Sequence, residues 1–197
     1  FLRENIYGPG KGEYLDNDER FVFFNRAILE FLNKEKISAD IIHCNNWPTA
    51  LIPVFLNTHY AKQSLFKNVA TAFTLHNISY QGEFPPESLA LTGLNWNYFN
   101  SSELSLNGKF NFLKAGILYS DVINTVSSSY KKEVLTRKLG FGLDSILKDR
   151  ADVFSSIRNG IDYEIWNPAN DLFAGSKLSQ QLVSGAFPFL LDLFSYH

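Results

Sequence analysis

Four clusters of polar residues follow short apolar runs in this chain, and their side chains are of the kinds that bind sugars. Asparagine and glutamine present hydrogen-bond donors and acceptors together, which suits sugar hydroxyls. Trp47 and Tyr80 add flat aromatic rings that could stack on a sugar ring. The clusters are HCNNW at 43–47, HNISYQG at 76–82, SSSY at 127–130 and RNGID at 158–162. Together they predict a carbohydrate-binding cleft.

Other chemistries are poorly supported by the same residues. A glycoside hydrolase needs a close pair of carboxylates, whereas Asp162 is the only acid in the four clusters. The chain has four histidines, and no two have the spacing of a helical metal-binding motif, so no metal site is predicted. The glycines of GPGKG at 8–12 follow no predicted strand, so they do not indicate a phosphate-binding loop.

Several of these residues also have ordinary structural interpretations. His43, at the end of a predicted strand, fits a hydrogen-bonded structural histidine, and Cys44 fits a buried core residue. Ser127 would serve as a simple helix cap, and Asn159 with Gly160 as a turn. For His76 and Asn77 a functional role is favoured, because the pair opens a long polar loop.

The elements that must position these clusters alternate between helix and strand. Apolar residues recur at helical spacing over 17–34, with Asp16 as the expected N-cap and Glu19 as its capping-box partner. Residues 46–62 are predicted to be helical, with Thr49 as the cap and Pro53 in the first turn, where a missing amide hydrogen costs little. Further helices are predicted at 87–91, 109–120, 127–138 and 141–150.

Strands are predicted at 39–44, 69–75, 121–126 and 153–158, and each precedes one polar cluster. This alternation predicts the α/β class, with a doubly wound, mostly parallel sheet and helices on both faces. Ligands bind such sheets beyond the carboxyl ends of the strands. The four clusters should therefore converge on one edge, with the long 77–108 segment as a functional loop.

The composition sets further limits. Of the 197 residues, 45% are hydrophobic and 19% are charged, so a folded core is expected. A net charge of -2 gives no field that would attract nucleic acid or an anionic membrane. The single cysteine suits a reducing compartment, and a cytoplasmic location is predicted. No apolar run is long enough to span a membrane. The chain begins with Phe1 and contains no methionine, so it is expected to be part of a longer protein.

Longer motifs, taken in order, resemble a known family. They include YLDNDERFVFFNRAILEFL, DIIHCNNWPTALIPVFL, FTLHNISYQGEFP and NGIDYEIWNPAND. The chain resembles, from about residue 7 to residue 171, the N-terminal half of bacterial glycogen synthases and plant starch synthases, the retaining glycosyltransferases of family 5. This resemblance implies a Rossmann-like domain, the first of the two that form a GT-B enzyme. It also implies transfer of glucose from ADP-glucose to the non-reducing end of an α-1,4-glucan, with no metal or redox cofactor.

The resemblance also assigns roles to residues. His76 matches the family's active-site histidine. The substrate-binding residues that it implies are Asn46, Trp47, Asn77, Tyr80, Gln81, Gly82 and Asn159. The implied partners are ADP-glucose and the glucan, without nucleic acid or membrane.

Departures from the family are also visible. Asn46 stands where the family has an aspartate, Ser128 replaces a proline, and the lysine-and-glycine loop near the donor phosphates is absent. We expect residues 1–171 to form the N-terminal catalytic domain, incomplete at its start. Residues 172–197 are expected to form a divergent tail, and we expect the second domain of the family to be absent. An isolated chain of this kind is predicted to be inactive. The alternatives are a non-catalytic glucan-binding module or pseudoenzyme, and an unrelated doubly wound binding domain.

Overall fold

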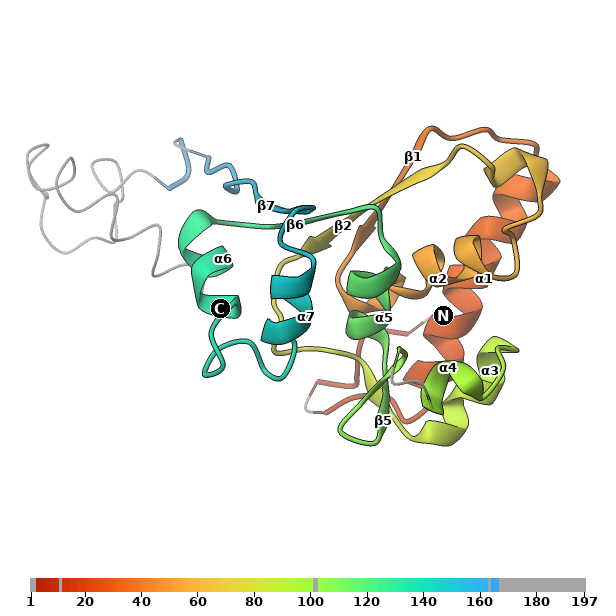
Figure 1. Ribbon diagram of the computed structural model, residues 1–197, viewed down its shortest axis with the longest axis horizontal. Helices are drawn as coiled ribbons and strands as arrows, with labels where there is room; N and C mark the ends of the chain where they lie inside the picture. Colours follow the sequence, from red (N-terminus) through yellow and green to blue (C-terminus); the bar gives the residue numbers. More distant parts are fainter. Residues whose placement is uncertain (1–2, 11, 101–102, 163, 167–197) are drawn as a thin grey trace, which may run out of the picture.

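The computed structural model describes residues 3–10, 12–100, 103–162 and 164–166. Its centre is a four-stranded, fully parallel sheet in the order β1-β2-β6-β7 (Figure 1). The strands are β1 Ile41–Asn45, β2 Ala70–Leu75, β6 Val122–Thr125 and β7 Phe154–Ser156. The predicted parallel sheet and its four strands are therefore confirmed. The predicted boundary at Asp171 and the tail at 172–197 lie outside the described residues.

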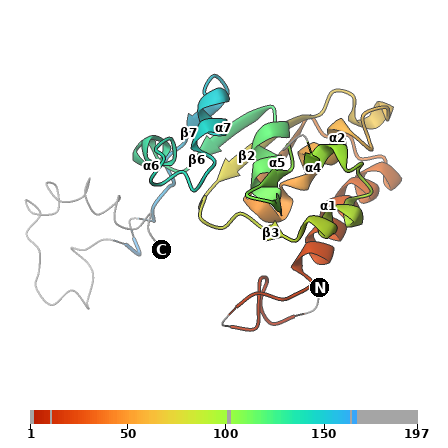
Figure 2. The same cartoon turned by 60° about the horizontal axis from the view of Figure 1, so that its bottom comes forward.

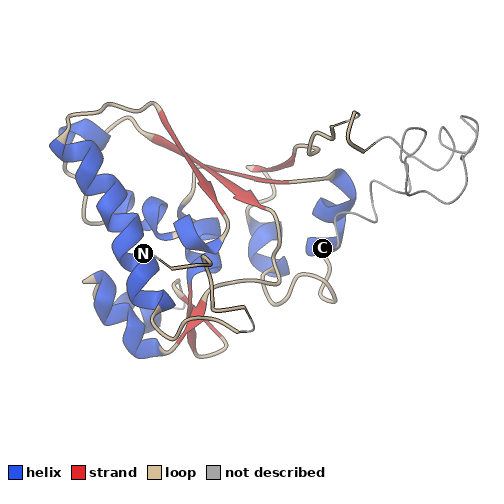
Figure 3. Cartoon of the chain, turned by 180° about the vertical axis from the view of Figure 1, so that it is seen from behind, coloured by secondary structure: helices blue, strands red, loops and turns tan. Residues whose placement is uncertain are grey.

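The helices that connect these strands lie against one face of the sheet. Figures 1 and 3 draw α2 (Leu51–Asn57), α5 (Phe112–Tyr119) and α7 (Asp144–Asp149) on the same side of the strands. Every connection steps in the same direction across the sheet, and right-handed crossovers then put their helices on one face. On the other face, Ile41 and Val122 are 65% and 49% exposed. In the described part, these strands thus have helical cover on one face, where cover on both was expected.

The core forms where α2 and α5 pack on the sheet. Leu51, Phe55, Phe73 and Leu113 are fully buried there. Gly116 allows α5 to lie close, because a Cβ at this position would stand 2.6 Å from the Phe73 ring and 2.9 Å from the Ala50 side chain. This contact fixes the height of α5 above β2.

Helix α1 spans Asn17–Lys34, the range expected from its apolar spacing. Asp16 occupies the N-cap position as expected, but its side chain makes no capping hydrogen bond. Its carboxylate instead accepts two hydrogen bonds from the Arg3 guanidinium, at 2.8 and 2.7 Å. Arg3 and Asp16 thus tie the N-terminal segment to the start of α1.

The segment after β1 contains less helix than the sequence predicts. It forms the 3-10 turn η1 (Trp47–Thr49) and then α2, which ends at Asn57 rather than near residue 62. Pro53 lies in the first turn of α2, as predicted. Thr49 does not cap this helix, because the N-cap position is Ala50 and no side chain bonds there. A 3-10 turn, η2 (Ser64–Phe66), then leads to β2.

The predicted loop at 77–108 contains regular structure. A three-stranded antiparallel sheet in the order β3-β5-β4 is built from β3 Glu83–Phe84, β4 Ser105–Leu106 and β5 Lys109–Asn111. The expected short helix appears as η3 Pro86–Ser88 and α3 Leu89–Thr92, followed by α4 Asn97–Asn100. Helix α3 lies against α1, and Figure 2 draws α4 and β3 in the same half of the molecule as α1. The helix predicted at 109–120 begins later, at Phe112, because residues 109–111 form β5.

The last connection runs from β6 through α6 (Ser128–Val134) and α7 to β7. Ser127 caps α6 as predicted, since its hydroxyl accepts a hydrogen bond from the Tyr130 amide at 3.0 Å.

Among the described helices, none has the length and hydropathy needed to cross a bilayer.

Candidate functional site

The parallel register brings the predicted polar clusters to one edge of the sheet. Asn45 pairs with Thr74, and Thr125 pairs with both Leu75 and Ser156. The strands therefore end side by side, and the amide of Asn159 donates to the carbonyl of Val126 at 3.2 Å just beyond them. The prediction that the clusters after all four strands share the carboxyl edge is confirmed.

A cavity of about 620 Å³ opens at this edge beside the end of β1. Its size falls in the range of small-molecule sites. Its lining comes from the turn after β1, from His76, from the N-terminal segment and from α1: Arg3, Glu4, Asn5, Ile6, Tyr7, Arg20, Phe21, Phe24, Asn45, Asn46, Pro48 and His76. Two predicted site residues, Asn46 and His76, thus meet in one cavity.

His76 is held by two asparagine side chains. Its Nε2 lies 2.9 Å from Asn45 Oδ1, and its backbone amide donates to Asn46 Oδ1 at 2.9 Å. Partial burial lowers the pKa of His76, and the nearby His43 lowers it further. An ordinary histidine pKa of about 6.5 is already below neutrality, so the lowered pKa of His76 favours the uncharged imidazole at pH 7.

Asn46 has an unusual backbone, with φ 54° and ψ -175°. Side-chain-bearing residues rarely adopt positive φ, and positive φ combined with an extended ψ is found almost only in glycine, so Asn46 is strained. The conformation is held by neighbours: the Asn46 amide donates to Thr74 O at 3.0 Å, and its carbonyl accepts from the Thr49 amide at 3.3 Å. The orientation of its side chain is also fixed, because the His76 amide can only donate and therefore faces Oδ1.

The structure does not place Trp47 where a ligand could stack on it. Its indole is 3% exposed and packs against Phe21, with ring centroids 4.6 Å apart. Gly82 covers the same ring, since a Cβ there would stand 2.5 Å from Trp47 Cε3. In this structure the two residues are packed against each other, so the expected direct sugar contact by the Trp47 face is not available.

Gln81 is likewise a packing residue here, with 8% of its surface exposed. Its Nε2 donates to the carbonyl of Phe141 at 3.1 Å, and its Oε1 accepts from Asn111 Nδ2 at 2.6 Å. Both ends of the amide are thus engaged by protein. Gln81 links the loop after β2 to α5 and to the turn before α7.

Two residues of the same loop remain accessible. The Tyr80 ring is 63% exposed. Asn77 is exposed as well, and its Oδ1 accepts hydrogen bonds from the amide and the hydroxyl of Ser79 at 3.0 and 2.6 Å. Tyr80 could still stack on a sugar, whereas the Asn77 carbonyl shapes the turn.

Asn159 lies at the carboxyl edge of the sheet but away from His76 and Asn46. It is exposed at the end of β7, on the far side of the sheet order from β1, and does not line the 620 Å³ cavity. The described part of the chain therefore brings His76 and Asn46 together and leaves Asn159 apart from them.

The ordinary interpretations of two residues agree with their contacts. His43 Nε2 hydrogen-bonds Thr74 Oγ1 at 2.7 Å. Cys44 is fully buried, and this burial raises the pKa of its thiol to about 12, so it stays an unreactive thiol. Within the described residues, no group of three or more His, Cys, Asp or Glu side chains is placed to hold a metal ion.

Asn45 and Thr49 were missed as site residues by sequence reasoning. Asn45 sits between His43 and Trp47 in the first polar cluster, and it is the residue that contacts the His76 ring. Its position as the last residue of β1 was a usable signal, because the parallel neighbour delivers His76 just beyond the same level. Thr49 gave no such signal, since a threonine before an apolar run is typical of a helix cap.

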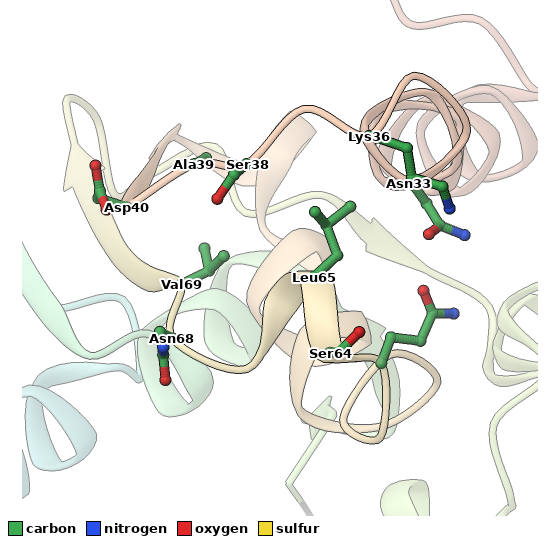
Figure 4. A pocket seen from close by; sticks show the side chains of 10 residues that line it. Asn33, Lys36, Ser38, Ala39, Asp40, Ser64, Leu65, Asn68 and Val69 are labelled. Atoms are coloured by element: carbon green, nitrogen blue, oxygen red, sulfur yellow. The ribbon is translucent and has the colours of Figure 1, made fainter.

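A second cavity, of about 770 Å³, lies at the opposite edge of the sheet (Figure 4). Asp40 and Val69 line it just before β1 and β2 begin, and Figure 4 shows Lys36, Ser64 and Asn68 around it. None of the predicted site residues lies there. Since ligands of such sheets bind at the carboxyl edge, the smaller cavity beside His76 is the better candidate.

Comparisons with known proteins agree on one family. The sequence profile described as "Starch synthase catalytic domain" matches residues 1–149. The chain is 47% identical over 184 residues to a glycogen synthase of Thermodesulfovibrio yellowstonii, which covers 93% of this chain and 37% of that protein. It is 41% identical over 193 residues to glycogen synthase 2 of Geobacter sulfurreducens, which covers 98% of this chain and 40% of that protein.

A solved structure is similar as well. It is the catalytic domain of starch synthase IV from Arabidopsis thaliana bound to ADP and acarbose, with a TM-score of 0.75 and 34% identity. The match covers 98% of this chain and 39% of that one. The chain thus spans well under half the length of these relatives. The Geobacter alignment runs past Asp171, and a domain boundary at that residue stays a prediction.

Proposed function

The chain belongs to the starch synthase catalytic domain family, and from this premise we propose that it supplies one wall of the cleft of a retaining glucosyltransferase. In the proposed reaction, glucose moves from ADP-glucose to the non-reducing end of an α-1,4-glucan. The ADP and acarbose bound to the starch synthase IV domain support a nucleotide donor and a sugar acceptor for this chain as well.

One observation carries the proposal. His76 and Asn46 line the same cavity at the carboxyl edge of the sheet, which is where ligands of doubly wound domains bind. The uncharged imidazole and the amide of Asn46 are suited to hydrogen-bonding sugar hydroxyls. Tyr80, exposed on the neighbouring loop, adds an aromatic face.

The chain's own residues would bind and orient the glucosyl group rather than stabilise the leaving diphosphate. Charge that develops on a diphosphate is best stabilised by fixed cations and by helix N-termini. Two arginines line the cavity, but the Arg3 guanidinium is engaged by the Asp16 carboxylate, and Arg20 donates to the carbonyl of Ile6 and to Asn17 Oδ1. We propose that the phosphate-binding cations come from the part of a family enzyme that lies beyond this chain.

The cofactors, partners and location that we propose are those that membership of the family implies. We propose no metal and no redox cofactor for the transfer, and no nucleic acid or membrane partner. A cytoplasmic location would supply ADP-glucose and glucan together, and would keep the thiol of Cys44 reduced.

A non-catalytic glucan-binding module is the second candidate, and Asn46 favours it. A carboxylate at this position could stabilise positive charge that develops on the sugar ring, whereas an amide carries no charge. The module would keep acceptor binding through the same edge and lack turnover.

A chimeric enzyme separates the two candidates. The chain replaces the matching segment of the Thermodesulfovibrio glycogen synthase, and incorporation of labelled glucose from ADP-glucose into glycogen is measured. We expect incorporation that His76→Ala abolishes. A folded chimera that binds glycogen but incorporates no glucose, even with Asn46→Asp, would reject the enzyme and favour the module.

A further inference from the structure

The side chain of Asn45 contacts the imidazole of His76 directly. Asn45 is the last residue of β1, and His76 follows the last residue of the neighbouring strand β2. The register that pairs Asn45 with Thr74 brings the two side chains to the same level of the edge, where Asn45 Oδ1 lies 2.9 Å from His76 Nε2. Both residues line the 620 Å³ cavity.

Asn45 is itself held in place by the hydroxyl of Thr49. The Asn45 amide donates to Thr49 Oγ1 at 2.6 Å, and the same hydroxyl donates to the Asn45 carbonyl at 3.0 Å. One hydroxyl therefore satisfies both backbone groups of Asn45 and closes the turn between β1 and η1. A side chain that starts from a fixed backbone can hold its partner more accurately than one on a mobile loop.

The backbone of His76 is fixed separately, by Asn46. Its amide donates to Asn46 Oδ1, and Asn46 is held by Thr74 and Thr49. Asn46 thus fixes the position of the His76 backbone, and Asn45 fixes the orientation of the His76 imidazole ring. Two consecutive residues therefore hold the backbone and the ring of one histidine.

An amide oxygen can only accept a hydrogen bond, so the ring nitrogen that faces it must carry a proton. We propose that Asn45 is a positioning residue that holds His76 with its proton on Nε2 and leaves Nδ1 as the acceptor of the ring. With a proposed sugar ligand, Nδ1 would then accept a hydrogen bond from a hydroxyl group. This last step rests on the proposed function, whereas the fixed tautomer does not.

The charged and titratable groups around His76 are consistent with a neutral ring. Partial burial lowers its pKa, and the nearby His43 of β1 lowers it further. The other ionisable groups that line the cavity are Arg3, Glu4 and Tyr7 of the N-terminal segment and Arg20 of α1. Among the residues lining the cavity, Glu4 is the only carboxylate that could favour the protonated ring.

Nitrogen-detected NMR of the 197-residue chain tests the tautomer without any substrate. We expect the ¹⁵N shifts of His76 to report a proton on Nε2 at neutral pH. Asn45→Leu, which removes the acceptor at an exposed position, should give a mixture of both tautomers. A proton on Nδ1 in the unchanged chain, or the same single tautomer in the leucine variant, would overturn the proposal.

A titration of His76 gives a second and independent measurement. Asn45→Asp keeps the acceptor oxygen and adds a charge against Nε2, so it should raise the pKa of His76 and preserve the tautomer. Asn77→Asp is the matched control, because it adds the same charge one residue away without facing Nε2. An equal or larger rise in the control would overturn the proposal.

The two hypotheses fail in different ways. Loss of glucose transfer in the chimera with an unchanged Nε2–H tautomer would count against the proposed function alone. Thr49→Val keeps the side-chain volume and removes both hydroxyl contacts to Asn45. While the chain stays folded, this variant should shift His76 towards the mixture of tautomers expected for Asn45→Leu. No shift in this variant would overturn the role assigned to Thr49 in the positioning.

Discussion

At the scale of single residues, Asn46 combines two demands that few side chains meet. Its positive φ excludes most residues, and its side-chain oxygen must accept the His76 amide. Aspartate offers the same acceptor oxygen on a side chain of the same shape, so it would bear the same backbone strain. The exchange of aspartate for asparagine at this position therefore changes the charge of the site without changing its framework.

Stability measurements on Asn46 variants should follow this reasoning. We expect Asn46→Asp to change the free energy of unfolding by less than about 0.5 kcal/mol, because the acceptor is kept. Asn46→Ala should cost about 1–3 kcal/mol, because it leaves the His76 amide without its acceptor and keeps the backbone strain. Urea unfolding followed by circular dichroism measures both, and an alanine variant as stable as the aspartate variant would contradict the assigned role.

Gly82 gives a second residue-scale prediction. A Cβ there would meet the Trp47 ring at 2.5 Å, and φ is +61°. Gly108 is the matched control, since its φ is +77° and a Cβ added there would have no atom within 4 Å. Both alanine variants carry the backbone cost of about 1–3 kcal/mol, and Gly82→Ala should lose more because Trp47 must also shift. Equal losses in thermal unfolding would show that the contact with Trp47 costs nothing.

At the scale of elements, the periodic parts of the sequence predicted the fold well. Helix α1 was predicted with its observed limits, because its apolar stripe is long and regular. The four strands and their shared carboxyl edge followed from alternation with helices. The capping of α1 was not predictable from Asp16, because its partner Arg3 lies in a segment with no periodic signal.

The site was predicted less completely than the fold. His76 and Asn46 were found from motif and family likeness, and both line the cavity. Trp47 and Gln81 belong to the same motifs, yet both are buried, since a motif does not distinguish residues that touch a ligand from those that hold the loop. Burial depends on contacts with residues far away in the chain, such as those of Gln81 with Asn111 and Phe141.

Asn111 supports a prediction at the element scale. Its Oδ1 caps α5 through the Lys114 amide at 2.8 Å, and its Nδ2 donates to Gln81 at 2.6 Å in a buried site. Ser127 caps α6 in a partly buried site and provides the comparison. Ser127→Ala should cost about 1 kcal/mol, and Asn111→Ala should cost about 2–4 kcal/mol because it also leaves Gln81 without its donor. Equal costs in urea unfolding would mean that the link to Gln81 adds no stability.

At the scale of the whole molecule, the uncovered face of the sheet favours association. Ile41 and Val122 are exposed there, and in the described part β1 has a neighbour on one side only. Open edges and apolar patches promote pairing between copies. We expect the 197-residue chain to self-associate in light scattering, and Ile41→Lys to reduce this. A monodisperse monomer at high concentration would contradict the prediction.

The catalytic prediction also belongs to this scale, because it concerns the chain as a unit. The cavity beside His76 is open, and its two arginines, Arg3 and Arg20, are engaged by other groups of the protein. Glycosyl transfer to a diphosphate leaving group requires aligned charges in a site that excludes water. Loss of one aligned donor in comparable anion-stabilising sites costs about 2.7–4 kcal/mol, so a site that lacks several should turn over too slowly to detect.

We therefore expect the 197-residue chain alone to incorporate no labelled glucose from ADP-glucose into glycogen, while the chimera does. Weak glucan binding should persist, because His76, Asn46 and Tyr80 remain at the carboxyl edge. The decisive comparison is between the chain and its His76→Ala variant at equal concentration. Incorporation by the chain that this variant abolishes would refute the expectation, because the residues of this one wall would then be sufficient for the transfer.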